Sequence, residues 1–255
     1  MKKALAAEFS KLLSLPTIWI AVAVGILVAP VIAGIRSFQE LSEITKGVQT
    51  AVEYPIGFEE LGFGVMGVII VGIIAISSEY FTESEESGGG GRQMTTSLTA
   101  IPSRIRFLLS KATAVATVSA ILAIIAITLT MIVVQFILVE HAPALEITDI
   151  SRLIGVVCYW VLTALMAFGI TILTRHAALP LAVLILNNSV VTVTYLLTRI
   201  TPLANYLPDM AGIRMFVEIK DAGSTLTPLG GGVVMAAWVT ALLIFGTITF
   251  CRRDV

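Results

Sequence analysis

The chain has 255 residues, of which 57% are hydrophobic and only 13% are charged, and its formal net charge at pH 7 is −1. A soluble domain of this size carries far more charge on its surface, and a near-neutral balance gives no electrostatic reason to expect a nucleic-acid partner. Little length remains for a separate globular unit. The composition therefore predicts a single all-α integral membrane domain over residues 1–255.

The first sixteen residues have the pattern of a short amphipathic helix. Leu5 and Phe9 recur along one face, whereas Glu8 and Lys11 lie on other faces and Pro16 ends the pattern. This arrangement is typical of a helix that lies in the membrane interface. A cleaved signal peptide is the alternative, but the apolar stretch that follows is longer than a normal signal core.

Six long apolar stretches contain no charged residue and no histidine. A helix needs roughly 20 apolar residues to cross a ~30 Å hydrocarbon core, and a backbone in lipid must satisfy its own hydrogen bonds. Each stretch therefore predicts a membrane-spanning helix. The stretches are 17–35, 61–78, 112–138, 153–173, 179–197 and 231–250. Ion-coupled carriers generally place ionisable groups at membrane depth, so their absence from these stretches favours another source of energy.

Two of the stretches contain features that point to helix packing. Small residues such as Gly67 and Gly72 are frequent in the second, which predicts that it packs closely either inside a helix bundle or at a subunit contact. Asn187 and Asn188 lie midway along the fifth. Because amides in lipid need partners, they either bind neighbouring helices or contact a translocation path, and the sequence leaves both roles open.

The segment 79–111 carries the most information among the polar parts of the chain. Gly88–Gly91 predicts a flexible hinge, and no phosphate-binding motif is present there or elsewhere in the sequence. Leu98 and Ile101 follow at helical spacing and Pro102 ends that helix. Apolar residues in such a pattern need an apolar groove, either in the chain's own base or in a partner.

The segment 198–230 is too apolar for a free loop and too interrupted by Pro202 and Pro208 for a span. It predicts short re-entrant helices that dip into the bilayer against protein. With six spans, ten of the sixteen Lys and Arg residues fall on the side of the N-terminus and six on the other. The positive-inside rule then predicts a multi-pass protein of the plasma membrane with both termini cytoplasmic.

Four places in the sequence resemble the membrane subunits of type-2 ABC exporters. Ala7–Ser14 is similar to the amphipathic elbow of that family, and Glu79-Tyr80 with Thr96–Arg104 and Lys111 downstream resembles its strongest signature. Tyr206–Gly212 and Arg252–Asp254 resemble motifs of the last outer gap and of the chain end. The four occur in the family's order. One departure is the long insertion between the Glu-Tyr pair and the basic helix, which the family normally lacks.

The resemblance implies a permease subunit with no cofactor or metal of its own, paired with a second copy or a related permease. It also implies a separate ABC ATPase subunit that binds ATP and drives export of a hydrophobic or amphiphilic cargo such as a drug, an antibiotic or a bacteriocin-like peptide. The residues that it assigns to ATPase coupling are Glu8, Lys11, Arg92, Thr95, Thr96, Leu98, Ile101, Pro102 and Arg104.

Three other classes of protein are alternatives. An intramembrane protease is disfavoured because Arg92 follows Glu85-Glu86 too late for the Glu-Glu-x-x-x-Arg pattern and because His141 and His176 lie in loops. An ion-driven secondary transporter would be favoured by a charge at the membrane midplane. A non-transporting immunity or scaffold protein would be distinguished by a lack of ATP dependence.

Overall fold

All regular structure in the described part of the chain is helical, as the sequence predicts. The computed structural model describes residues 2–47, 56–80, 103–142, 147–188, 193–217 and 226–252. In chain order the elements are α1 (Lys2–Ser14), α2 (Pro16–Thr45), α3 (Phe58–Ser77), η1 (Ser78–Tyr80), α5 (Arg104–Leu138), η3 (Val139–His141), α6 (Ile147–Thr174), α7 (Ala178–Asn187), α8 (Val193–Thr198), η4 (Pro202–Tyr206), α9 (Pro208–Ile213) and α10 (Pro228–Arg252).

Five of these helices, within the described residues, are long and apolar enough to cross a membrane. They occupy Pro16–Thr45, Phe58–Tyr80, Arg104–His141, Asp149–Thr174 and Pro228–Arg252. The predicted span 179–197 differs from this set. It contains α7 and α8, neither of which is long enough to cross alone, and residues 189–192 lie outside the described part. A sixth crossing therefore stays a prediction.

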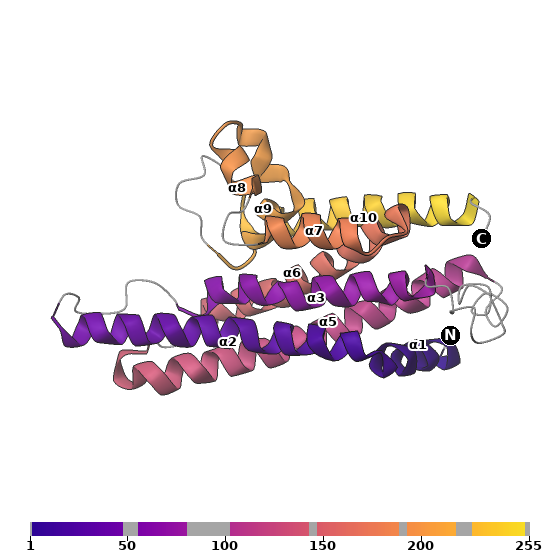
Figure 1. Cartoon of the computed structure of the whole chain (residues 1–255). Coiled ribbons are helices and arrows are strands. Elements are labelled where there is room, and N and C mark those ends of the chain that lie inside the picture. Colours follow the sequence, from indigo (N-terminus) through magenta and orange to yellow (C-terminus); the bar gives the residue numbers. More distant parts are fainter. Residues whose placement is uncertain are drawn as a thin grey trace.

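The long helices form one bundle (Figure 1), in which α2 and α5 run away from the chain termini and α3, α6 and α10 run back. We call the end that holds α1 and the end of α10 the terminal end, and the opposite end the distal end. Figure 1 shows α8 and α9 near the beginning of α10, away from the termini. In the bundle, residues that are far apart in the sequence lie side by side.

Helix α3 is the most buried of the long helices and packs between α2 and α6. A Cβ atom on Gly67 would lie 2.5 Å from the backbone of Gly25 in α2, and one on Gly72 would lie 2.2 Å from the carbonyl oxygen of Ala164 in α6. The close approach needs glycine, because a side chain would push the helices apart. The prediction that this stretch packs inside a bundle is confirmed.

The helix ends depart from the predicted ends because hydropathy marks where charge begins, whereas a helix continues as long as its hydrogen bonds do. Helix α5 begins at Arg104, eight residues before the apolar stretch, and the Ser103 side chain accepts a hydrogen bond from the Arg106 backbone. Helix α2 likewise continues ten residues past position 35, to Thr45.

The amphipathic helix at the N-terminus is present as α1, and Leu15 separates it from α2, which begins at Pro16. Its orientation differs from the prediction in one respect. Glu8, expected on the polar face, is buried together with Leu12, while Leu13 is half exposed. Glu8 turns inward because it has a buried cation to bind, and that contact defines the first candidate site.

Candidate functional site

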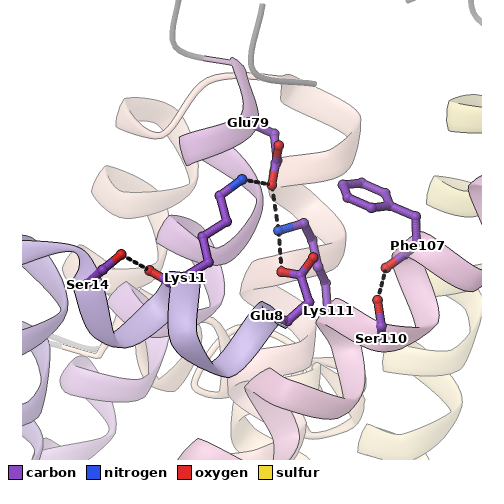
Figure 2. Close-up of polar contacts among 7 residues, drawn as sticks. All are labelled: Glu8, Lys11, Ser14, Glu79, Phe107, Ser110 and Lys111. Atoms are coloured by element: carbon purple, nitrogen blue, oxygen red, sulfur yellow. Dashed lines mark hydrogen bonds and ion pairs between the residues drawn. The ribbon is translucent and has the colours of Figure 1, made fainter. Parts of the chain in front are cut away.

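Four charged side chains meet at the terminal end of the bundle (Figure 2). Glu8 and Lys11 come from α1, Glu79 follows α3 in η1, and Lys111 lies in the second turn of α5. We call these four residues the charged cluster. Three elements that are far apart in sequence are thereby joined at one point.

Lys111 is the centre of the charged cluster. Its Nζ lies 2.7 Å from Oε2 of Glu8 and 2.7 Å from Oε1 of Glu79, and Lys11 donates to the same oxygen of Glu79. Lys111 is 2% exposed and Glu79 is 0% exposed, whereas the Lys11 side chain is partly open to solvent. The two acids and two bases neutralise one another, which is the condition under which buried charge is tolerated.

Aromatic side chains and a helix end close the cluster on the side of α10. The Lys111 ammonium lies 5.1 Å from the centre of the Phe107 ring, and this ring stacks on Phe250 with centroids 6.2 Å apart. Arg104 Nη1 donates to the carbonyl oxygens of Phe250 and Cys251, at 3.3 and 3.1 Å. A cation at the last carbonyls of a helix is favourable, so the start of α5 is tied to the end of α10.

The second residue of the Glu79-Tyr80 pair faces a different neighbour. The Tyr80 ring packs against the core, and the guanidinium carbon of Arg175 lies 6.0 Å from its centre. Arg175 follows α6 and has a positive φ of 58°. The pair therefore contacts both the elbow helix and the end of α6.

The remaining predicted coupling residues cannot be placed. Glu8, Lys11 and Arg104 lie in the positions given above. The other six lie outside the described residues, and they are Arg92, Thr95, Thr96, Leu98, Ile101 and Pro102.

A second polar group lies where the predicted fifth span is divided. Asn187 at the end of α7 donates to Oδ2 of Asp209 in α9 at 2.7 Å, and the Thr194 hydroxyl of α8 donates to the same oxygen. The Thr194 hydroxyl also lies 2.9 Å from Oδ1 of Asn187. We call Asn187, Thr194 and Asp209 the Asp209 site.

Asn188 has partners of its own. Its Oδ1 accepts a hydrogen bond from the Tyr159 hydroxyl of α6 at 3.1 Å, and its Nδ2 donates to the Leu184 carbonyl at 2.9 Å. Both asparagines therefore bind neighbouring elements, which is the first of the two roles left open by the sequence. A contact with a translocation path stays a prediction.

An apolar groove of about 700 Å³ opens between α6 and α10. Arg152 lies at its rim, where its Nε donates to the Phe216 carbonyl at 3.0 Å and its guanidinium stacks over the Phe58 ring at 4.2 Å. The groove is otherwise lined mainly by small and apolar side chains, including Gly155, Cys158, Leu162, Gly232, Val233 and Ala236.

The sequence analysis gave no role to Thr194, and it included Lys111 and Asp209 in family motifs without predicting either as a site residue. Lys111 stands at the edge of a 27-residue apolar stretch, and a lysine there reads as an ordinary membrane-boundary residue. Asp209 could have been found, because it is the only acid between Pro202 and Arg214, in a segment judged too apolar for a free loop.

The sequence matches the family described as ABC-2 family transporter protein over residues 4–197. The match includes the elbow helix, the Glu79-Tyr80 pair and the division between α7 and α8, and it ends before α9 and α10. No curated protein matches the chain. ABC-2 permeases lack a nucleotide-binding domain and work with ABC ATPase subunits. The chain belongs to the ABC-2 transporter family, as a multi-pass membrane component without its own ATPase domain.

Proposed function

We propose that this chain is the permease subunit of an ATP-driven exporter in the plasma membrane, with six crossings and both termini cytoplasmic. The terminal end of the bundle then faces the cytoplasm and the distal end faces outward. Charge supports this orientation, since ten of the sixteen Lys and Arg residues fall on the side of the termini. A second copy of the chain or a related permease completes the transport path.

The cargo that we propose is hydrophobic or amphiphilic, and includes drugs, antibiotics and bacteriocin-like peptides. The groove between α6 and α10 supports this class, because its lining offers apolar surface with one guanidinium, Arg152, at the rim. Ligand sites of this kind bind mainly by apolar contact and use a few polar groups for orientation.

The charged cluster is the observation that carries the proposed mechanism. It fastens the elbow helix to the end of α3 and the start of α5 through Glu79 and Lys111, the first and last residues of the segment 79–111. An ATPase that docks on this segment and on the elbow would therefore move α3 and α5 together. Opening and closing of a transport path by such rigid-body tilting is an established kind of transition.

The docking step is tested by co-purification with a co-expressed cognate ABC ATPase. Leu98→Asp puts an unpaired charge into an apolar groove, so we expect it to release the ATPase while the permease stays folded, because truncating a buried interface anchor commonly costs about 2 kcal/mol or more. Leu98→Met is the matched control and should retain the ATPase. Full retention and full ATP-driven transport in Leu98→Asp would contradict the proposal.

The transmission step is tested by Lys11→Met. Lys11 connects the elbow to Glu79, and its loss leaves Glu79 paired with Lys111, so the bundle should remain folded. We expect the ATPase to co-purify but ATP-driven transport to fall several-fold. Lys46→Met, which removes an exposed lysine at the distal end, should transport normally. Equal transport by both variants would mean that the charged cluster only holds the fold.

A further inference from the structure

Asp209 is a buried acid whose observed partners are uncharged. It is 8% exposed, and its Oδ2 accepts from the Asn187 amide and the Thr194 hydroxyl. No Lys, Arg or His in the described residues forms an ion pair with it. A buried carboxylate with neutral donors alone is expensive, and proteins usually neutralise it with a cation or a proton.

The nearest arginines in sequence are engaged elsewhere. Arg214, five residues after Asp209, donates through Nη2 to Oδ1 of Asn205 at 2.8 Å, and Arg199 donates to the Tyr195 hydroxyl at 2.7 Å. Burial lowers the pKa of Arg214, although an arginine keeps its proton in proteins. Among the described residues, neither arginine forms an ion pair with Asp209.

The end of α7 adds negative potential to the same place. Asn187 is the last residue of this ten-residue helix, and the final carbonyls of a helix carry a partial negative charge. Broken helices of membrane transporters bind cations in this way, at the ends of half-helices. Here Asn187 at the end of α7 and Thr194 of α8 both contact Asp209, which itself lies in the first turn of the short helix α9.

The atoms of the Asp209 site suit a small hard cation. Three side-chain oxygens converge from three elements: a carboxylate oxygen of Asp209, the Thr194 hydroxyl and Oδ1 of Asn187. The Thr194 backbone N–H also donates to Oδ1 of Asn187 at 3.3 Å, which holds this oxygen beside the Thr194 hydroxyl. Nowhere in the described residues do three His, Cys, Asp or Glu side chains gather as a metal site, so one carboxylate with neutral oxygens favours a single charge over a divalent ion.

We propose that Asp209, Asn187 and Thr194 form a binding site for one positive charge, carried either by Na⁺ or K⁺ or by an ammonium group. The bound charge neutralises Asp209 and holds α7, α8 and α9 together. An ammonium group would belong to a cargo molecule, and only that source rests on the proposed export function.

The test measures thermal unfolding of the full chain in lipid nanodiscs without ATPase. Matched chloride solutions contain Na⁺, K⁺, methylammonium or N-methylglucamine, the last of which is too large to enter. We expect one of the small cations to raise the unfolding midpoint by about 3–6 °C at tenfold its dissociation constant. A rise with methylammonium alone identifies an ammonium site, and a rise with Na⁺ or K⁺ identifies an alkali site.

Three variants make the result specific. Asp209→Asn keeps the shape of the side chain and should abolish the rise, and Thr194→Val keeps the charge but should weaken cation binding several-fold. Asp149→Asn is the matched control, because that distal carboxylate faces Arg152 and should respond like the unmodified chain. No rise with any small cation, or an equal rise in Asp209→Asn, would overturn the proposal. Because no ATPase takes part, that failure would leave the proposed export function standing.

Discussion

The charged cluster and the Asp209 site differ in whether their buried charges are balanced. The charged cluster at the terminal end balances two acids with two bases, and its central lysine contacts both acids. The Asp209 site contains one acid and only neutral donors among its observed partners. The charges of the first site balance one another, whereas the second site would be balanced by the positive charge that we propose. Charge balance therefore separates a structural joint from a candidate binding site.

The sites also differ in what they join. Glu8 and Lys111 are 103 residues apart, and Lys11 and Glu79 are 68 apart, so the charged cluster closes long loops of the chain. Asn187 and Asp209 are only 22 residues apart. The Asp209 site therefore joins only α7, α8 and α9, whereas the charged cluster joins α1, the end of α3 and α5.

The largest effect that we predict comes from breaking the balanced site. Lys111→Met leaves Glu8 buried without a cation and removes one of two cations from Glu79, so it should lower the free energy of unfolding by about 3–5 kcal/mol. Thermal unfolding in detergent measures the loss. The double variant Glu8→Gln with Lys111→Met should recover part of it, because the unpaired acid is gone. A loss below about 1 kcal/mol in Lys111→Met would show that the cluster is not a structural joint.

The next effect is expected at the unbalanced site. Asn187→Leu removes the amide donor to Asp209 and the acceptor for Thr194, so we expect a loss of about 2 kcal/mol, since hydrogen bonds to charged groups contribute more than neutral ones. A small cation that binds beside Asp209 should reduce this loss, and thermal unfolding with and without the cation measures both quantities. Unchanged stability together with changed export would instead place Asn187 on a transport path.

The spans were predictable from the sequence because the exclusion of charge is a property of each segment alone. The division of the fifth stretch was not, since 179–197 is as free of charge as the others. Its pair of asparagines was the available signal. The structure places Asn187 at the end of α7, where its amide donates a hydrogen bond to Asp209 in α9.

The burial of Glu8 could not be predicted from sequence patterns, for a different reason. Helical periodicity sorts residues by hydrophobicity, so it assigns a glutamate to the exposed face. The inward orientation of Glu8 is favourable because Lys111, near the start of α5, forms an ion pair with it. The same reasoning explains Asp209, whose neighbours Asn187 and Thr194 come from elements that precede it in the chain.

The smallest effect concerns the contact that supports the Asp209 site from α6. Tyr159→Phe keeps the ring that packs on Phe216, with centroids 5.2 Å apart, and removes only the hydroxyl that donates to Asn188. Hydrogen bonds between membrane helices contribute on average about 0.6 kcal/mol, so a loss of this size is expected in thermal unfolding. Tyr206→Phe, at an exposed phenol, is the control and should lose less. A loss above about 2 kcal/mol in Tyr159→Phe would mean that Asn188 and Asn187 act as one coupled network. The Asp209 site would then extend to α6, and the comparison between a local site and a bundle-wide joint would no longer hold.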